Sequence, residues 1–286
     1  MTGPTEFLGR HVVARLAAGP FEIIAASRRP PDSGLALRWH QVDLMVGDEV
    51  GSMFTALRPT HLIHLAWCAG GASYRSDPTN RDWAHASAMI ARRFFQHGGR
   101  RALFAGTSVE YQAPDARSLY AASKIEAAAA IQAEAQARSG QFAWGRIFLP
   151  YGPHDGAHRL VPSVIDALLA GRTAQCSVGT QIRDFIHVDD VAAAFVALLD
   201  ADIEGPVDIG TGRGLTVREA VQEIGRLVGR EDLLRFDGPA PAGEPESLVA
   251  RPGQLLALGW RARPVETGFA QTIEWRRTRS SSSWRQ

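Results

Sequence analysis

The chain has 286 residues and a mass of 31.0 kDa, and its 31 Lys+Arg against 30 Asp+Glu give a formal charge of +1 at pH 7. This balance creates no field that would attract nucleic acid or an anionic membrane surface, and the length suffices for a large α/β core. Cys68 and Cys176 have neither disulfide-framework nor zinc-site spacing, so we expect a reducing cytoplasm and no metal site. The start lacks a signal-peptide pattern and no apolar run approaches the ~18 residues of a membrane span, so we expect neither export nor an anchor.

The eight residues after Met1, TGPTEFLG, have the spacing of a phosphate-binding turn that leads into a helix. In a GxxGxxG turn one glycine allows a tight bend, one lets the backbone approach a pyrophosphate, and one lets the helix pack on its strand. Gly3 and Gly9 occupy the outer positions, but Glu6 replaces the middle glycine and adds a negative charge. We predict cofactor contacts from Gly3, Phe7, Leu8 and Gly9, weakened by Glu6. A helix start that binds no ligand is the alternative.

The strand that should precede this turn is absent from the sequence, because Gly3 lies two residues from the start. In a doubly wound sheet that strand is central, and each neighbour would present unpaired backbone groups at roughly 1–3 kcal/mol for each one buried without a partner. We expect something else to fill the slot, or the sheet to close up. Either the natural start lies upstream of Met1, or the protein is a degenerate relative of its fold.

Apolar helices and strands then alternate along the first half of the chain. Leu8, Val12 and Leu16 recur at helical spacing until Gly19-Pro20 ends the helix. The elements expected next are strands at 21–27 and 39–44, a helix ending near Arg58-Pro59, a strand at 61–67, a helix at 82–97 and a strand at 101–106. Strands separated by such helices require crossover connections, so we predict an α/β fold with a doubly wound, Rossmann-like parallel sheet, and a dinucleotide-binding domain over residues 1–150.

The strand at 21–27 ends in Ser27-Arg28-Arg29, where a dinucleotide site reads the ribose of its cofactor. An acidic residue at this point binds the free ribose hydroxyls of NAD(H), whereas arginine accommodates the 2′-phosphate of NADP(H). Ser27 and Arg28 therefore favour NADP(H), with NAD(H) as the other option. Two solvated arginines without a ligand are the plain alternative.

The segment LFAGTSVEY, followed by SLYAASK, contains the residues with the clearest chemistry. Tyr120 and Lys124 are four residues apart in a strongly helix-forming stretch, so they share one helix face. An ammonium group beside a phenol lowers the pKa of the phenol from ~10 and makes Tyr120 a candidate acid/base near neutral pH. Thr107 or Ser108, at the end of the preceding strand, is placed to hydrogen-bond the same substrate oxygen.

The second half of the chain is less regular, with Pro and Gly clusters at 150–156 and 238–245. We expect residues 151–275 to form most of a smaller C-terminal substrate-binding lobe, with a part at about 180–200 returning to the sheet. The final stretch, 276–286, is polar and low in complexity, and we expect it to be disordered.

Together these motifs resemble the extended short-chain dehydrogenase/reductases, which are NAD(P)-dependent nucleotide-sugar epimerases, dehydratases and reductases. The resemblance covers nearly the whole chain. Its segments are TGPTEFLG, VDL (42–44), HLAW (64–67), GTSVEY (106–111), YAASK (120–124), RIFLPYGP (146–153), RDFIHVDDVA (183–192), DIGTG (208–212) and LGW (258–260). It implies a homodimer formed by the long helices around 82–97 and 120–138.

The resemblance also implies roles for single residues. Tyr120 resembles the general acid/base, Lys124 the residue that binds the nicotinamide ribose and tunes that tyrosine, and Thr107 the catalytic Ser/Thr. Ser108 is its substitute and a substrate contact. The further cofactor contacts that the resemblance implies are Asp43, Leu44, Leu65 and Ala66.

In the second lobe, Arg183 resembles the arginine that binds the diphosphate of the substrate. An ion pair with Asp184 or Asp189 is the structural alternative for Arg183. His187, Asp189 and Asp190 resemble a motif that joins the lobe to the sheet, so we interpret them as structural and not as a metal site.

The function that the resemblance implies is an NADP(H)-dependent oxidoreductase acting on a nucleotide-activated sugar, with reduction of a 4-keto-6-deoxy sugar as the favoured reaction. A nucleotide-sugar 4-epimerase uses the same three catalytic residues. A non-catalytic relative with a degenerate cofactor turn is the rival from another class, and Glu6 favours it. Dehydration is disfavoured, because Ser108 and Val109 follow Thr107 where the dehydratases have an Asp-Glu pair.

Overall fold

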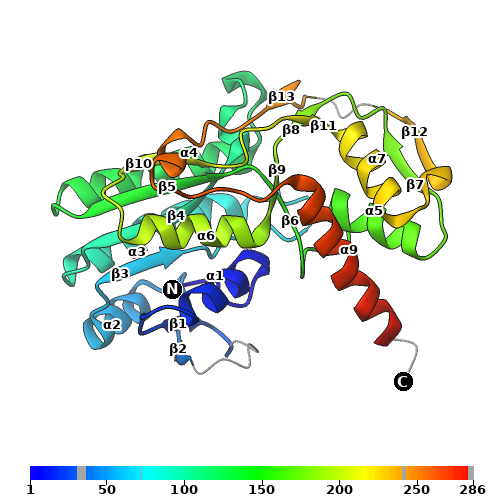
Figure 1. Cartoon of the computed structure of the whole chain (residues 1–286). Coiled ribbons are helices and arrows are strands. Elements are labelled where there is room, and N and C mark those ends of the chain that lie inside the picture. Colours follow the sequence, from blue (N-terminus) through cyan, green and yellow to red (C-terminus); the bar gives the residue numbers. More distant parts are fainter. Residues whose placement is uncertain (31–36, 72, 240–242, 283–286) are drawn as a thin grey trace. The chain divides into compact units, whose positions relative to one another are not determined.

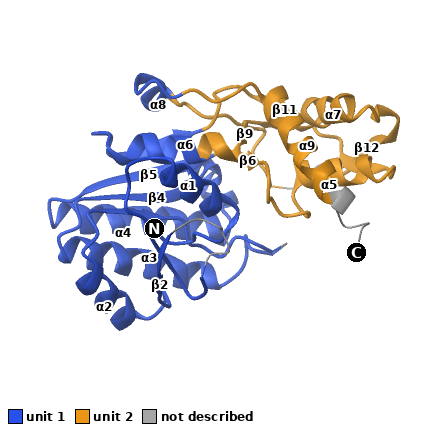
Figure 2. Cartoon of the chain, turned by 60° about the horizontal axis from the view of Figure 1, so that its bottom comes forward, with its two compact units in different colours: residues 1–147, 192–209, 253–260 blue, residues 148–191, 210–252, 261–286 orange. Residues whose placement is uncertain are grey.

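The structure is a computed structural model, and it describes residues 1–30, 37–71, 73–239 and 243–282. The chain divides into two compact units (Figure 2): unit 1 comprises 1–147, 192–209 and 253–260, and unit 2 comprises 148–191, 210–252 and 261–286. Every residue predicted to be catalytic or to bind the cofactor belongs to unit 1. Arg183 belongs to unit 2.

Unit 1 contains a parallel sheet with helices on its faces (Figure 1). Its strands are β1 (Ile24–Ser27), β2 (Arg38–Gln41), β3 (His61–His64), β4 (Arg101–Thr107), β5 (Gln141–Ile147) and β10 (Gly205–Ile209). They pair in the orders β1-β2 and β10-β5-β4-β3, and every one of these pairings is parallel. Its helices are α1 (Phe7–Ala17), α2 (Gly47–Leu57), α3 (Thr79–Gln96), α4 (Leu119–Gln136), the later part of α6 (Val188–Leu199) and α8 (Gly253–Ala257). The predicted doubly wound α/β fold is confirmed.

The first two residues of the chain lie between β1 and β3. Thr2 forms parallel bridges to Ala26 and to His64. The N–H of Thr2 donates to the carbonyl of Ile63 at 3.0 Å, and the N–H of Ala26 donates to the carbonyl of Met1 at 2.8 Å. These contacts join the two groups of strands and deliver the chain directly into the turn that begins at Gly3.

One face of the sheet is covered by α2, α3 and α4, which bury their apolar sides against it. The amphipathic pattern of α3 explains why this long helix packs there, since Ile90, Ala91 and Phe94 are buried and lie on one side. The cluster also contains Val50, Phe54, Phe104, Ile131 and Trp144. Helix α1 buries Val12, Val13 and Leu16, and with α6 it lies on the opposite face (Figure 2).

Unit 2 is a smaller assembly of short strands and three helices in its described part. The strands are β6 (Leu149–Tyr151), β7 (Ala174–Ser177), β8 (Ile182–Arg183), β9 (Phe185–His187), β11 (Leu215–Thr216), β12 (Leu234–Gly238) and β13 (Ser247–Leu248). The helices other than the first turn of α6 are α5 (Leu160–Leu169), α7 (Val217–Val228) and α9 (Val265–Ser282). Tyr151, Ile165, Phe185, Ile224 and Phe269 are among its buried core residues.

The expected disorder of residues 276–286 is wrong for most of that stretch. Helix α9 continues to Ser282, and residues 283–286 lie outside the described part. Arg276 explains the difference, because its side chain is buried, forms an ion pair with Asp166 and donates to the carbonyl of Asp155 at 2.9 Å. A polar sequence is therefore ordered by contacts with residues more than 100 positions earlier.

Candidate active site

The turn after Thr2 depends on two glycines that no other residue can replace without movement. Gly3 has a φ of +68°, and a Cβ added there would lie 2.8 Å from the backbone nitrogen of Ala66. A Cβ added at Gly9 would lie 1.8 Å from the carbonyl oxygen of Gly3. The first turn of helix α1 thus touches the turn, and the turn touches the segment that follows β3, which is the close packing that a dinucleotide turn requires.

Glu6 occupies the position immediately before α1. Its φ of −77° is ordinary, so the backbone here does not require glycine. The side chain is exposed and forms no capping hydrogen bond to α1, whose residues are all described. The main-chain geometry is therefore compatible with a bound pyrophosphate, which the N-terminus of α1 would attract. The carboxylate of Glu6 adds a negative charge at the same place and would repel the pyrophosphate.

The other predicted cofactor residues follow the carboxyl ends of β1, β2 and β3, the edge of the sheet at which such folds bind ligands. Ser27 ends β1, and its hydroxyl donates to the carbonyl of Arg29 at 2.6 Å. The backbone N–H of Asp43 donates to the carboxylate of Glu49 at 2.8 Å. The remaining members of this set are Arg28, which is exposed, and Leu44, Leu65 and Ala66, which are buried.

Tyr120 and Lys124 lie on the buried side of α4, which Ser118 caps through a hydrogen bond from the N–H of Ala121. They are only 9% and 3% exposed. The ring of Tyr120 makes edge contacts with Trp67 and Tyr74, at centroid distances of 6.2 and 5.1 Å. The structure thus places the phenol in an aromatic surrounding and the amine one helical turn further along the same face.

The Lys124 amine has aromatic neighbours and one carbonyl partner. Nζ lies 3.6 Å from the centroid of the Trp67 ring and 5.8 Å from that of Tyr120, and it donates to the carbonyl of Ala105 at 2.8 Å. Burial lowers the pKa of Lys124 from 10.5 to about 7, and the negative charge of Glu110 opposes this shift. At neutral pH the amine is therefore poised between its two protonation states, which is unusual for lysine.

Lys124 is also the only lysine in the sequence, and the other 30 basic residues are arginines. Arginine stays protonated at any physiological pH and presents a planar fork of donors, whereas the pKa of lysine shifts when the amine is buried. The single exception to arginine usage therefore falls on the lysine of the YxxxK pattern, whose buried amine has a lowered pKa. A count of residue types would have added this signal to the YxxxK pattern.

Thr107 ends β4 and caps the short 3-10 helix η1 (Ser108–Tyr111). Its hydroxyl oxygen accepts a long hydrogen bond of 3.4 Å from the N–H of Val109, and its own N–H donates to the carboxylate of Glu110 at 2.8 Å. This is a reciprocal capping box. Ser108 follows Thr107 in the first position of η1.

Arg183, the predicted substrate-binding arginine, is buried in β8 of unit 2. Its guanidinium forms a 2.8 Å ion pair with Glu244 and donates to the carbonyl of Ile182. The expected structural alternatives were wrong about the partner. Asp184 instead accepts hydrogen bonds from the backbone N–H groups of Thr211, Gly212 and Ala250, and Asp189 lies 3.8 Å from Arg263.

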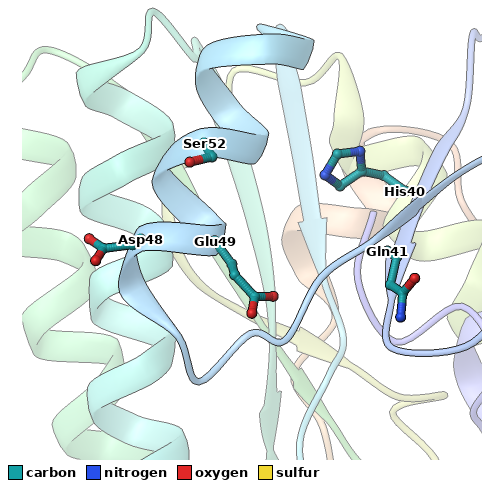
Figure 3. Close-up of a pocket in the computed structure, with 5 residues that line it drawn as sticks. All are labelled: His40, Gln41, Asp48, Glu49 and Ser52. Carbon is teal, nitrogen blue, oxygen red and sulfur yellow. The ribbon is translucent and has the colours of Figure 1, made fainter.

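An open hollow of about 550 Å³ lies between β2 and the start of α2. Figure 3 shows that His40 and Gln41 come from the strand, and that Asp48, Glu49 and Ser52 come from the helix. None of these five residues was predicted to be functional. Glu49 also accepts the N–H of Asp43, so the hollow adjoins one of the predicted cofactor contacts.

The comparisons with known proteins agree with this geometry. The model of the NAD dependent epimerase/dehydratase family matches residues 1–210. The chain belongs to this family. It is 30% identical to GDP-L-fucose synthase 1 of Arabidopsis thaliana over 85% of each chain. It is 26% identical to dTDP-4-dehydro-6-deoxy-D-allose reductase of Streptomyces bikiniensis over 96% of this chain and 94% of that one. The UDP-glucose 4-epimerase of Thermus thermophilus, solved with NAD, superposes with a TM-score of 0.85 at 25% identity, covering 96% and 97% of the two chains.

Three residues beside Thr107 were not predicted from the sequence to belong to the site. They are Glu110, which binds the N–H of Thr107, and its two other donors, Trp144 and Arg146. Thr107 and Glu110 have the spacing of a capping box, T-x-x-E, and this signal was available. The side chains of Trp144 and Arg146 had no such signal, because only the strand register brings them to Glu110.

In the described ranges, no helix is long and apolar enough to cross a membrane, and no cluster of His, Cys, Asp or Glu could hold a metal ion.

Proposed function

We propose that the chain is an NADP(H)-dependent oxidoreductase that reduces the 4-keto group of a nucleotide-activated 6-deoxy sugar. The observation that carries this proposal is the buried pair on α4, in which Lys124 has a pKa of about 7 beside the ring of Tyr120. The family to which the chain belongs supports the nicotinamide cofactor. The allose reductase and the fucose synthase among its relatives support the substrate class.

The residues that would hold the dinucleotide follow from the turn and the strand ends. Gly3 and Gly9 allow the close approach of a pyrophosphate to the first turn of α1, with Phe7 and Leu8 beside it. Arg28, exposed after β1, would pair with a 2′-phosphate, which supports NADP(H) over NAD(H). Asp43, Leu44, Leu65 and Ala66 complete the proposed lining together with Ser27.

When bound, the nicotinamide supplies the hydride that reduces the keto carbon. The residues of the chain protonate the keto oxygen of the substrate and stabilise its developing negative charge. As this oxygen gains negative charge, Tyr120 donates its phenolic proton to it, and the ammonium of Lys124 stabilises the phenolate that remains. The hydroxyl of Thr107 accepts from Val109, so its proton is available to donate to the same oxygen, with Ser108 as a second substrate contact.

Titration of the protein with NADPH and with NADH, followed by fluorescence, tests the cofactor part of the proposal. We expect binding tighter than millimolar, with NADPH preferred, and weaker binding in Lys124→Ala. Binding weaker than millimolar for both dinucleotides would instead favour a non-catalytic member of the family, whose turn Glu6 has disabled.

A screen of nucleotide-activated 4-keto-6-deoxy sugars with both cofactors tests the reaction. Tyr120→Phe removes only the phenolic oxygen, so we expect turnover to fall by about 10²–10⁴-fold with the cofactor still bound. Tyr151→Phe is the matched control, because it removes a buried phenol in unit 2 that donates to the carbonyl of Val265. Equal turnover in Tyr120→Phe and in Tyr151→Phe would contradict the role given to Tyr120.

A 4-epimerase is the second candidate, and the structural similarity to UDP-glucose 4-epimerase favours it. An epimerase needs no net reductant, because the dinucleotide returns to its starting state in each cycle. Protein purified with its own dinucleotide would then interconvert UDP-glucose and its 4-epimer without added NADPH. This outcome, with no consumption of NADPH on any 4-keto sugar, would replace the reductase proposal.

The proposal includes a cytoplasmic homodimer that pairs α3 and α4 of one protomer with those of its partner. Helices α3 and α4 pack on each other and are linked by the ion pair of Arg92 with Glu134 at 2.8 Å. Light scattering after gel filtration tests this assembly, since a mass of 31.0 kDa would identify a monomer.

A further inference from the structure

The carboxylate of Glu110 is buried at the end of β4 and is fully occupied by donors. Its side chain is 4% exposed. One oxygen accepts from the N–H of Thr107 at 2.8 Å and from Nε1 of Trp144 at 2.9 Å, and the other accepts from Nε of Arg146 at 2.9 Å. Three donors from two neighbouring strands thus hold one carboxylate and fix its position.

The register of the strands explains how Trp144 and Arg146 reach Glu110. Phe104 pairs with Trp144 and Gly106 pairs with Arg146, so both donors lie on the same face of β5, two residues apart. Gly106 makes room for the indole, because a Cβ there would lie 2.2 Å from Nε1 of Trp144. The glycine of the GTSVEY segment is therefore required by packing in the strand that carries Thr107.

A further layer of contacts fixes Arg146. Its guanidinium donates to the hydroxyl of Tyr111 at 3.2 Å and lies 5.0 Å from the centre of that ring. The Tyr111 hydroxyl in turn donates to Asp208 at 2.9 Å. Asp208 pairs with Arg146 in the register of β10 and β5. Glu110 is thus the inner end of a network that spans the ends of three adjacent strands.

The network acts on the two groups that the proposed reaction needs. It fixes the main chain at Thr107, which sets the direction of the threonine hydroxyl. It also places a carboxylate on the Trp144 side of Lys124, whose amine lies 5.7 Å from the centre of the Trp144 ring. Among the described residues, Tyr120 on α4 and His64 on β3 also interact with Lys124, and His64 is neutral at physiological pH because burial lowers its pKa to about 3.

We propose that Glu110 is a positioning residue of this enzyme: its buried carboxylate orients Thr107 toward the reacting oxygen and provides a negative charge that favours the protonated form of Lys124. The orientation of Thr107 toward a reacting oxygen rests on the proposed function, whereas the effect of Glu110 on the protonation of Lys124 concerns the protein alone. Glu110 touches neither substrate nor cofactor in this proposal and acts through Thr107 and Lys124.

Because Lys124 is the only lysine, its titration can be observed directly. Protein made with ¹³C-lysine gives one side-chain Cε resonance, whose pH dependence reports the pKa of Lys124. We compare the parent with Glu110→Gln, which keeps the shape and removes the charge. Glu134→Gln is the matched control, since Glu134 lies on the same helix as Lys124, ten residues or about 15 Å along α4, and pairs with Arg92.

In Glu110→Gln we expect the Lys124 resonance to titrate at lower pH than in the parent, and in Glu134→Gln we expect no change. With a nucleotide-activated 4-keto-6-deoxy sugar that the parent reduces, kcat of Glu110→Gln should fall by about 10–100-fold, with KM changed less than about 3-fold. The alkaline limb of the pH profile of kcat in Glu110→Gln should move to lower pH, as the titration of the Lys124 resonance does. A purely structural residue would lower activity equally at every pH.

Glu110→Asp keeps the charge and withdraws the carboxylate from Thr107, and it is the second variant if Glu110→Gln melts below the assay temperature. It should retain the Lys124 titration and lose kcat. An unchanged Lys124 titration in Glu110→Gln, measured below the melting temperature of this variant, overturns the proposal. If the parent reduces no 4-keto sugar, the proposed function fails, while the lysine resonance still decides whether Glu110 controls Lys124.

Discussion

A single lysine among 30 arginines lies at the centre of the proposed chemistry. We predict that Lys124→Arg abolishes turnover although it keeps the positive charge, because a planar guanidinium cannot occupy the place of an amine that is 3% exposed between Trp67 and the carbonyl of Ala105. Overpacking should also lower the free energy of unfolding by about 1–3 kcal/mol. Arg138→Lys, two residues beyond the end of α4, keeps the charge that pairs with Glu134 and should change it by less than about 0.5 kcal/mol. Urea unfolding and the turnover assay measure both effects, and full activity in Lys124→Arg would contradict the role of a titratable amine.

The second prediction at this scale concerns Glu6. Its exposed carboxylate lies at the start of α1, where phosphate would bind, and its φ of −77° shows that the backbone tolerates a side chain. Removing the charge in Glu6→Gln should therefore tighten NADPH binding by about 2- to 5-fold, which corresponds to about 0.3–1 kcal/mol. Glu6→Gly also removes the side chain, so a larger gain in this variant would separate steric exclusion from charge. Fluorescence titration gives both affinities. Weaker binding in both variants would mean that Glu6 helps to hold the cofactor.

At the scale of the elements, two helical glycines predict opposite responses to alanine. In α1, a Cβ at Gly9 would lie 1.8 Å from the carbonyl of Gly3, so Gly9→Ala must displace the helix and should destabilise the protein by about 1–3 kcal/mol. In α2, a Cβ at Gly51 would meet only the Arg93 side chain, at 3.7 Å, so Gly51→Ala should stabilise it by about 0.5–1 kcal/mol. Urea unfolding of the two variants checks the difference. Equal effects would show that α1 is not pressed against its turn.

Most elements of unit 1 could be predicted from the sequence, because their apolar positions repeat with the period of the helix or run through a buried strand. Helix α9 could not, since its last turns are polar and Arg276 is held by Asp166 and the carbonyl of Asp155, which lie far away in the sequence. The site shows the same division. The spacing of Tyr120 and Lys124 on one helix predicts their shared face, whereas the contact of Glu110 with Arg146 depends on the register of β4 and β5.

Arg276 provides a test of that explanation for α9. We predict that Arg276→Ala destabilises the protein by about 1–3 kcal/mol, because the buried carbonyl of Asp155 loses its donor and Asp166 loses its ion pair. Arg277→Ala is the matched control, since the side chain of Arg277 is half-exposed and its ion pair with Glu274 is long, at 4.0 Å, and therefore weak. Thermal melts of the two variants measure the difference. Identical melts would mean that the order of α9 does not depend on Arg276.

At the scale of the whole molecule, buried titratable groups determine how stability changes with pH. His64 hydrogen-bonds Thr2 and Ser87 inside unit 1, and burial, reinforced by the charge of Lys124, lowers its pKa from 6.5 to about 3. Between these values the unfolded chain binds a proton that the folded chain does not, so stability falls as the pH falls. Asp155 in unit 2 acts oppositely. Burial raises its pKa from 3.8 to about 6, so its contribution is lost as the pH rises through this window.

We therefore predict that the contribution of His64 to the free energy of unfolding decreases below pH 6.5, by at most about 1.4 kcal/mol per pH unit, and that Asp155 offsets it between pH 6 and 3.8. His64→Gln cannot titrate, so its unfolding free energy should depend less on pH in this range, even if the loss of the ring lowers its stability throughout. In Asp155→Asn the free energy of unfolding should fall more steeply with falling pH between pH 6 and 3.8 than in the parent, because the contribution of Asp155 that offsets that of His64 is removed. Urea unfolding at about four pH values, followed by tryptophan fluorescence, measures the three slopes. If His64→Gln ran parallel to the parent, the imidazole would have to be protonated in both states or in neither, and its burial between Thr2 and Ser87 would not govern the acid stability of unit 1.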